Sequence, residues 1–199
     1  MPSWDERYGA DGYVYGTAPS RWLVVQAHRL PAGGRILSLG EGEGRNAVWL
    51  AQRGFSVVAV DGSAVGLAKA GRLAAARGVA VETVHADLTR YRPEPGAFDA
   101  LLLAYVHLPP PEREQVHAAG AAALRAGGLV VLEAFTPRQL AFASGGPRSA
   151  ELLYEPAALR ADFPGIAWEV LEESELVLDD GPLHQGRAAI VRGVGRRAR

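Results

Sequence analysis

The stretch Arg35-Ile-Leu-Ser-Leu-Gly-Glu-Gly-Glu-Gly-Arg-Asn46 decides the fold of this chain. Its apolar run ends at Leu39 and is bounded by glycines on both sides, which is typical of a strand buried on both faces of a parallel sheet. Three glycines then alternate with other residues: Gly40, Gly42 and Gly44. A helical pattern starts at Arg45. A glycine-rich turn between a buried strand and a helix lets the backbone approach a ligand closely, because no Cβ stands in the way.

The spacing of these glycines departs from the dinucleotide fingerprint G-x-G-x-x-G, which would place its last glycine where the chain has Arg45. This disfavours a nicotinamide-dependent oxidoreductase. A second apolar strand, residues 56–60, ends in Asp61. A carboxylate at that tip can accept two hydrogen bonds from a ribose diol. Strand, glycine loop, helix, strand and acid together predict a site for an adenosine-containing cofactor.

Several motifs in order carry a resemblance to a known family: 39–46, 58–63, 85–88, 98–103 and 124–131. The first two resemble the opening motifs of class I S-adenosylmethionine-dependent methyltransferases. The Gly44-Arg45-Asn46 ending is similar to the branch that contains tellurite-resistance and thiopurine methyltransferases. The likeness covers roughly residues 20 to 135.

Strands and helices alternate along the chain, which predicts an α/β, doubly wound, mostly parallel sheet with helices on both faces. The resemblance implies a Rossmann-like seven-stranded sheet in the order 3-2-1-4-5-7-6, with the last strand antiparallel. Residues 166–178 and 184–194 read as that antiparallel hairpin at the sheet edge, since Asp179-Asp-Gly-Pro182 between them is turn chemistry.

The resemblance also implies S-adenosyl-L-methionine as cofactor and assigns a set of binding residues: Arg7, Tyr15, Gly40, Glu41, Gly42, Gly44, Asn46, Asp61, Gly62, Ser63, Asp87, Leu88, Ala104 and Tyr105. The three loop glycines would let the chain pass beneath the methionyl part and the ribose. Glu41 would bind the cofactor amino group directly or through water. Arg7 is a candidate partner for the cofactor carboxylate, and Arg45 competes with it.

Two of these residues have an alternative interpretation. Asn46 equally suits a cap of its own helix. Asp87 would hold the adenine amino group by family resemblance, or else be a turn residue that caps the following segment.

Composition excludes several classes of protein. The chain has 199 residues, a net charge of -1 and no cysteine. Its length predicts one domain, and its charge argues against a nucleic-acid partner.

Because the chain has no cysteine, disulfides, thiolate zinc sites and cysteine nucleophiles are excluded, and no spacing of other residues indicates a metal site. No run has the length of a membrane span, and the start is no signal peptide, so we expect a cytoplasmic protein without a membrane partner.

Within that single domain, 1–199, we expect four parts. Residues 1–19 form an aromatic arm, which either covers the sheet edge or closes as a lid that sets aromatic faces near the sulfonium cation. Residues 20–135 form the cofactor-binding core. Residues 136–150 form a lid-like loop, because irregular stretches of that length tend to be functional. Residues 151–199 supply a helix and the edge hairpin.

Methyl transfer needs no protein nucleophile, which suits a chain without a convincing Ser-His-Asp set or paired carboxylates. Tyr105 and His107 lie where the resemblance places acceptor-facing residues, and they are the catalytic candidates. His107 would deprotonate or orient an acceptor, or else be a hydrogen-bonded structural residue. The Asn/Asp-Pro-Pro-Tyr motif is missing, which disfavours nucleobase N-methylation. We expect a small-molecule acceptor, chosen by the arm and the 136–150 loop; the alternative is a non-catalytic S-adenosylmethionine-binding protein.

Overall fold

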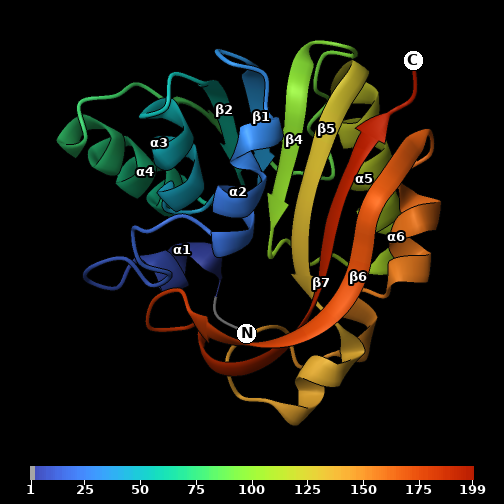
Figure 1. Ribbon diagram of the computed structural model, residues 1–199. Coiled ribbons are helices and arrows are strands. Elements are labelled where there is room, and N and C mark those ends of the chain that lie inside the picture. The colour runs from blue at the N-terminus through green and yellow to red at the C-terminus, as the bar shows by residue number, and fades with distance from the viewer. Residues whose placement is uncertain (1–2) are drawn as a thin grey trace.

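The computed structural model describes residues 3–199, in which seven strands form a single sheet (Figure 1). In chain order the strands are β1 (Arg35–Leu39), β2 (Ser56–Asp61), β3 (Glu82–His85), β4 (Phe98–Ala104), β5 (Leu124–Phe135), β6 (Ile166–Asp179) and β7 (Gln185–Arg197). They lie in the order β3-β2-β1-β4-β5-β7-β6. The first five are parallel, and β7 runs antiparallel between β5 and β6. The predicted sheet is confirmed.

Helices cover both faces of this sheet, as predicted. They are α1 (Trp4–Tyr8), α2 (Arg21–Gln26), α3 (Arg45–Ala51), α4 (Ala64–Ala76), α5 (Pro110–Ala123) and α6 (Pro156–Asp162), with 3-10 turns η1 (Ala27–Arg29), η2 (Pro137–Ala141) and η3 (Ala150–Leu152). Helices α2 and α3 pack on one face, and α5 and α6 pack on the other (Figure 1). None of the helices in the described part of the chain has the length and apolarity needed to cross a bilayer.

Strand β1 shows why its sequence gives a central strand. Ile36 belongs to the core beneath α2 and α3, whereas Leu37 and Leu39 belong to the core beneath α5 and α6. All three side chains are at most 3% exposed. Because neighbouring side chains on a strand point to opposite faces, Ile36 is buried on one face of the sheet and Leu37 and Leu39 on the other.

Some boundaries differ from those expected. The glycines at 127 and 128 predict a turn before a strand over residues 129–135, but β5 begins five residues earlier, at Leu124, directly after α5 ends at Ala123. Pairing with β4 is irregular here, since Phe98 pairs with Leu124 but Ala100 pairs with Leu129, so the glycine-containing segment between them bulges out. The sequence pattern predicts a strand over residues 79–84, but β3 begins only at Glu82, because the Val79 amide donates to the Ala74 carbonyl at the end of α4.

The N-terminal arm contains a helix that the sequence did not predict. Helix α1 starts after Ser3, whose side chain accepts a hydrogen bond from the Glu6 amide, while the Glu6 carboxylate accepts from the Ser3 amide. This reciprocal capping box stabilises a single turn of helix despite the glycines that follow. The arm then runs across the carboxyl ends of β1 and β2 (Figure 1).

Candidate cofactor and acceptor site

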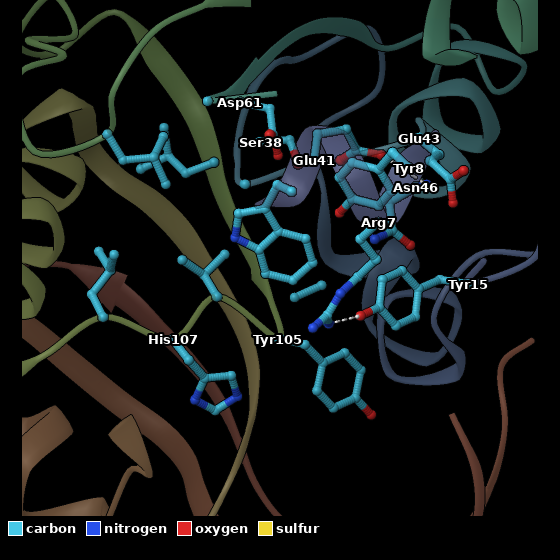
Figure 2. A pocket seen from close by; sticks show the side chains of 18 of the residues that line it. Arg7, Tyr8, Tyr15, Ser38, Glu41, Glu43, Asn46, Asp61, Tyr105 and His107 are labelled. Atoms are coloured by element: carbon cyan, nitrogen blue, oxygen red, sulfur yellow. Dashed lines mark hydrogen bonds between the residues drawn. The ribbon is translucent and has the colours of Figure 1, made fainter. Parts of the chain in front are cut away.

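A cavity of about 720 Å³ opens at the carboxyl ends of β1, β2 and β4, where the strand order reverses. This is where ligands bind in open α/β sheets. Figure 2 shows the side chains that surround it. The wall includes most of the predicted residues: Arg7, Tyr15, Gly40, Glu41, Asn46, Asp61, Gly62, Asp87, Leu88, Ala104, Tyr105 and His107. Gly42, Gly44 and Ser63 do not line it.

The three loop glycines serve different purposes. Gly40 lines the cavity with φ 65°, and a Cβ there would lie 2.6 Å from a methyl group of Val106. Gly42 and Gly44 also have positive φ, but they face protein: a Cβ would meet the Tyr8 hydroxyl at 2.5 Å or the Cβ of Ala70 at 2.6 Å. Their freedom from a side chain therefore serves packing of the arm and of α4, which is not the reason predicted from the sequence.

The Asp61 carboxylate is held at the cavity wall by two backbone amides. Oδ2 accepts from the Gly42 amide at 2.8 Å and Oδ1 from the Ser63 amide at 2.7 Å. Burial raises the pKa of Asp61, and these two bonds partly offset that rise. A carboxylate oxygen has two acceptor sites, so each can take one more bond from a ligand. Ser63 itself caps α4 and donates to Asp5.

Glu41 caps helix α3. One carboxylate oxygen accepts from the amides of Asn46 and Ala47, at 3.0 and 2.8 Å, and the other accepts from the Ser38 hydroxyl. Burial raises the pKa of Glu41, against the effect of these bonds. Any bond to a cofactor amino group is additional to these three and stays a prediction.

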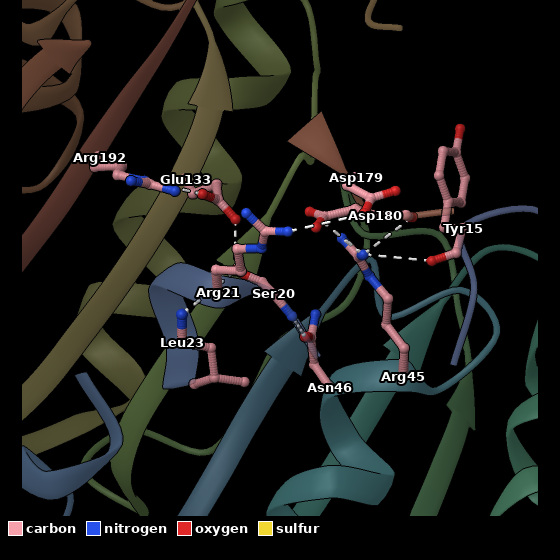
Figure 3. Close-up of polar contacts among 10 residues, drawn as sticks. All are labelled: Tyr15, Ser20, Arg21, Leu23, Arg45, Asn46, Glu133, Asp179, Asp180 and Arg192. Carbon is pink, nitrogen blue, oxygen red and sulfur yellow. Dashed lines mark hydrogen bonds and ion pairs between the residues drawn. The ribbon is translucent and has the colours of Figure 1, made fainter. Parts of the chain in front are cut away.

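The alternative that Asn46 caps its own helix is wrong, because Glu41 occupies the first free amides of α3. Asn46 Oδ1 instead accepts from the Ser20 amide at 2.9 Å, as Figure 3 shows. The Ser20 hydroxyl in turn donates to Glu133 at 2.5 Å, and Arg192 pairs with the same carboxylate at 3.1 Å. This network joins α2, α3, β5 and β7, and it holds Asn46 in the cavity wall.

Beyond β3, Asp87 is both a turn residue and part of the cavity wall. Its Oδ1 accepts from the amide and the hydroxyl of Thr89, at 2.9 and 2.7 Å, and these bonds lower the pKa of Asp87. The side chain is exposed, beside Leu88 and Gly62. The two interpretations offered by the sequence are therefore compatible.

The N-terminal arm lies over the cavity and contributes Trp4, Arg7, Tyr8 and Tyr15 to its wall (Figure 2). Arg7 Nη1 donates to the Tyr15 hydroxyl at 3.0 Å, and its guanidinium lies 4.6 Å from the Trp4 ring centre. It has no carboxylate partner among residues 3–199. Its competitor Arg45 pairs with Asp180 at 3.6 Å, with both side chains 8% exposed.

Aromatic rings form the end of the cavity beyond β4 and β5. The His184 ring lies 4.5 Å from Tyr15, 4.6 Å from Tyr105 and 5.4 Å from Phe135, between ring centres. Burial lowers the pKa of His184 to about 3, so its imidazole is neutral. Its Nδ1 and the Tyr105 hydroxyl are buried without a hydrogen-bond partner in the described part of the chain.

Tyr105 also carries local strain. Its φ of 58° makes it the one described residue other than glycine with a positive φ. Strained backbone of this kind concentrates at functional sites. Tyr105 is the first residue after β4. Its amide still donates a hydrogen bond to the Glu133 carbonyl of β5, at 2.7 Å.

His107 lines the cavity, but both of its ring nitrogens have backbone partners. Nδ1 lies 2.6 Å from the Leu152 carbonyl, and Nε2 accepts from the Phe135 amide at 3.3 Å. Burial lowers its pKa to about 4. Neither nitrogen is free to take a proton from an acceptor, so the geometry matches the structural interpretation of His107 and disfavours the catalytic one.

Sequence reasoning missed Phe135 and His184, because neither belongs to a motif. It also missed the role of Gly145 and Gly146 in the 136–150 loop. A Cβ at Gly145 would lie 2.7 Å from the His184 ring, and one at Gly146 would lie 2.8 Å from the Phe135 ring. The adjacent glycines were the feature of the sequence that could have indicated this role. They let the loop pass closely over the aromatic end of the cavity.

Comparison with known proteins matches the central part of this fold to a family. Residues 36–128 match a family whose description is "Methyltransferase domain". They are a methyltransferase domain. This confirms the resemblance to class I methyltransferases, enzymes with S-adenosylmethionine as cofactor. No curated protein matches the chain in sequence.

Solved structures share the fold of this protein across nearly the whole chain. A structure described as "Conversion of a Disulfide Bond into a Thioacetal Group during Echinomycin Biosynthesis" is 20% identical with a TM-score of 0.79, covering 98% of this chain and 88% of its own. TehB from Haemophilus influenzae is 15% identical with a TM-score of 0.71, covering 98% and 65%. N-methyltransferase NodS from Bradyrhizobium japonicum WM9, in complex with S-adenosyl-l-homocysteine, is 13% identical with a TM-score of 0.70, covering 98% and 87%.

Proposed function

We propose that the methyltransferase domain transfers the methyl group of S-adenosylmethionine to a small-molecule acceptor held at the aromatic end of the cavity. The observation that carries this proposal is one continuous cavity of about 720 Å³ with Asp61 at one end and Tyr105 and His184 at the other. Its volume lies within the range of roughly 300–1,000 Å³ that encloses small ligands. Donor and acceptor would therefore share a single enclosed space.

The cofactor end of the cavity has groups that fit an adenosylated amino acid. Asp61 retains acceptor capacity for a ribose diol, and Gly40 lines the wall of the same cavity, where a Cβ would displace Val106. Asp87 and Leu88 lie beyond them as an acceptor and an apolar contact for adenine. Arg7 offers a guanidinium that no acid of the described chain occupies, which suits the cofactor carboxylate.

The chemistry comes from the sulfonium, whose methyl group is already activated for attack. The protein aligns the two reactants and keeps water away. The arm and the loop around Gly146 both contribute to the wall of the cavity. Strained Tyr105 sets its ring against His184 at the aromatic end.

The charges of the acceptor end favour a neutral or anionic acceptor with a soft nucleophile, and a thiol fits best. The carboxylates in the wall, Glu41, Glu43, Asp61 and Asp87, all lie towards the glycine loop and the ends of β2 and β3. The residues that line the aromatic end, Tyr105, Phe135 and His184, include no acid that could pair with an ammonium group. A thiol ionises near pH 8.5 in water, so it needs no base from the protein. The structure with the echinomycin description concerns sulfur chemistry on this fold.

Calorimetric titration with S-adenosylmethionine, followed by an assay of released S-adenosylhomocysteine, tests the proposal. The acceptor panel contains aryl thiols, alkyl thiols, arylalkylamines of matched size and chalcogen oxyanions. We expect release with thiols to exceed release with the matched amines. Binding without turnover on any acceptor would favour the non-catalytic alternative. No binding of the cofactor would contradict the proposal entirely.

A further inference from the structure

Lys69 is the only lysine in a chain that otherwise uses arginine for its basic side chains. It lies in the middle of α4 and is 7% exposed, although lysine is almost never buried without a partner. Its ammonium donates three hydrogen bonds, to Glu43 Oε1 at 2.8 Å and to the carbonyls of Ala10 and Gly12 at 2.7 and 2.6 Å. All three protons of the ammonium are therefore used.

Glu43 connects this lysine to the glycine loop. It stands between Gly42 and Gly44 and is 4% exposed. While Oε1 accepts from Lys69, Oε2 accepts from the Val14 amide at 2.8 Å. One buried carboxylate is thus bonded both to α4 and to the arm.

These bonds converge on the segment 10–14, which lies between Arg7 and Tyr15, the two arm residues joined over the cavity. A further bond from the Tyr13 hydroxyl to the Lys69 carbonyl holds the same segment. The position of Arg7 and Tyr15 over the cavity therefore depends on a bonded pair, of which one member, Glu43, belongs to the glycine loop.

We propose that Glu43 and Lys69 are positioning residues that couple the glycine loop to the N-terminal arm, so that cofactor bound against the loop and the arm closed over it stabilise each other. The inference rests on the proposed function, because it places the cofactor against that loop. Coupling of this kind is reciprocal: whatever fixes the loop fixes the arm, and loosening the arm weakens cofactor binding by the same factor.

The Val14 amide gives a direct readout, because its hydrogen-bond acceptor is Glu43 itself. We expect S-adenosylmethionine to slow hydrogen exchange in peptides covering residues 9–16 of the wild-type protein. In Lys69→Met we expect this cofactor-dependent slowing to disappear and the Kd for S-adenosylmethionine to rise at least about fivefold, the lower end of typical coupling between sites.

Lys69→Met alone leaves Glu43 buried without its cation, which is strongly destabilising. The double variant Lys69→Met/Glu43→Gln removes both charges and keeps an amide oxygen for Val14, so it preserves folding while the tie to α4 is lost. The matched control is Arg72→Met, which removes an exposed positive charge from the same helix. We expect the double variant to show the raised Kd and the lost slowing, and Arg72→Met to behave as wild type.

A folded double variant with wild-type Kd and wild-type slowing at 9–16 would overturn the inference and leave the proposed function standing. A loss of thermal stability that is equal with and without cofactor, at unchanged Kd, would likewise assign the pair a purely structural role. If the wild-type protein itself fails to bind S-adenosylmethionine, the proposed function and this inference both fall.

Discussion

The Asp61 carboxylate accepts a hydrogen bond from the Gly42 amide across 2.8 Å, which ties the tip of β2 to the loop that follows β1. With the second bond from Ser63, at 2.7 Å, the carboxylate has a fixed position before any ligand binds. Burial raises its pKa, so its charged form is partly deprived of water. Two hydroxyl donors from a ribose would restore that lost solvation, which is why this position can contribute much to binding.

Asp61→Ala should weaken binding of S-adenosylmethionine by about ten- to a hundredfold. The reason is the loss of charge-assisted bonds worth roughly 1.5–3 kcal/mol. Isothermal titration calorimetry measures the effect. Asp11→Ala, which removes an exposed carboxylate from the arm, is the control and should change nothing. An unchanged affinity in the Asp61 variant would remove Asp61 from the cofactor site.

Arg7→Met should weaken binding of S-adenosylmethionine about tenfold and leave binding of its decarboxylated analogue unaffected. The Arg7 guanidinium lines the cavity and has no acidic partner among the described residues, so a cofactor carboxylate is its natural counter-charge. Titration of both ligands with each protein gives the comparison. Equal losses for the two ligands would show that Arg7 acts on the arm instead of on the carboxylate.

Arg45→Met serves as the contrast for Arg7. Arg45 is paired with Asp180, and its loss leaves that carboxylate buried and unpaired. We expect the urea midpoint of this variant to fall clearly, with no selectivity between the two ligands. A selective loss of affinity for the ligand with the carboxylate would instead reverse the assignment of the two arginines.

Tyr105→Phe should leave stability unchanged or raise it by up to about 1 kcal/mol. The Tyr105 hydroxyl is buried without a hydrogen-bond partner in the described chain. A buried polar group without a partner lowers the free energy of unfolding, so its removal should not destabilise the protein. The ring contacts with Phe135 and His184 persist in the variant. Urea denaturation measures stability, and release of S-adenosylhomocysteine measures turnover, which we expect to be retained. A variant that loses turnover at full stability would assign the hydroxyl to the acceptor.

The sequence predicted the sheet because the apolar pattern of each parallel strand agrees with the place of that strand in the sheet. In the run that ends at Leu39, Ile36, Leu37 and Leu39 are apolar and only Ser38 is not, which is typical of a central strand buried on both faces. Asp61 and Tyr105 gather at one cavity because parallel strands place their carboxyl ends at the same edge. To predict that these two residues lie close together, it was enough to assign the strands and to take their order from the family resemblance.

The contacts that complete the site could not be predicted in the same way. His184 reaches Tyr105 through the register of the antiparallel strands, where Phe135 pairs with Ile190, and no local pattern encodes that register. Lys69 bonds to Glu43 from helix α4, which α3 and β2 separate from the glycine loop along the chain. The capping role of Glu41 accords with the attraction of a carboxylate to the amino end of a helix, although Glu41 precedes the N-cap residue Gly44 and reaches the amides of α3 from within the loop.

The buried neutral imidazole of His184 should make the protein less stable in mild acid. The unfolded chain binds a proton at this residue near pH 6.5, whereas the folded protein resists protonation until about pH 3. Between these values the unfolded state holds more protons, so stability falls as the pH falls. From pH 7 to pH 5 this one group should cost about 2 kcal/mol.

Comparison of variants isolates this effect. Buried carboxylates such as Glu133, whose pKa is raised, shift the pH dependence of stability in the opposite direction, so the slope of the wild-type protein alone decides nothing. His184→Phe keeps an aromatic ring beside Tyr105 and removes the titration. In urea denaturation at pH 7 and pH 5, its loss of stability should be about 2 kcal/mol smaller than that of the wild type. His28→Gln, at an exposed position, should reproduce the wild-type loss. Equal losses in all three proteins would mean that the imidazole takes up its proton in the folded state without penalty, and that the aromatic end of the cavity admits water and charge.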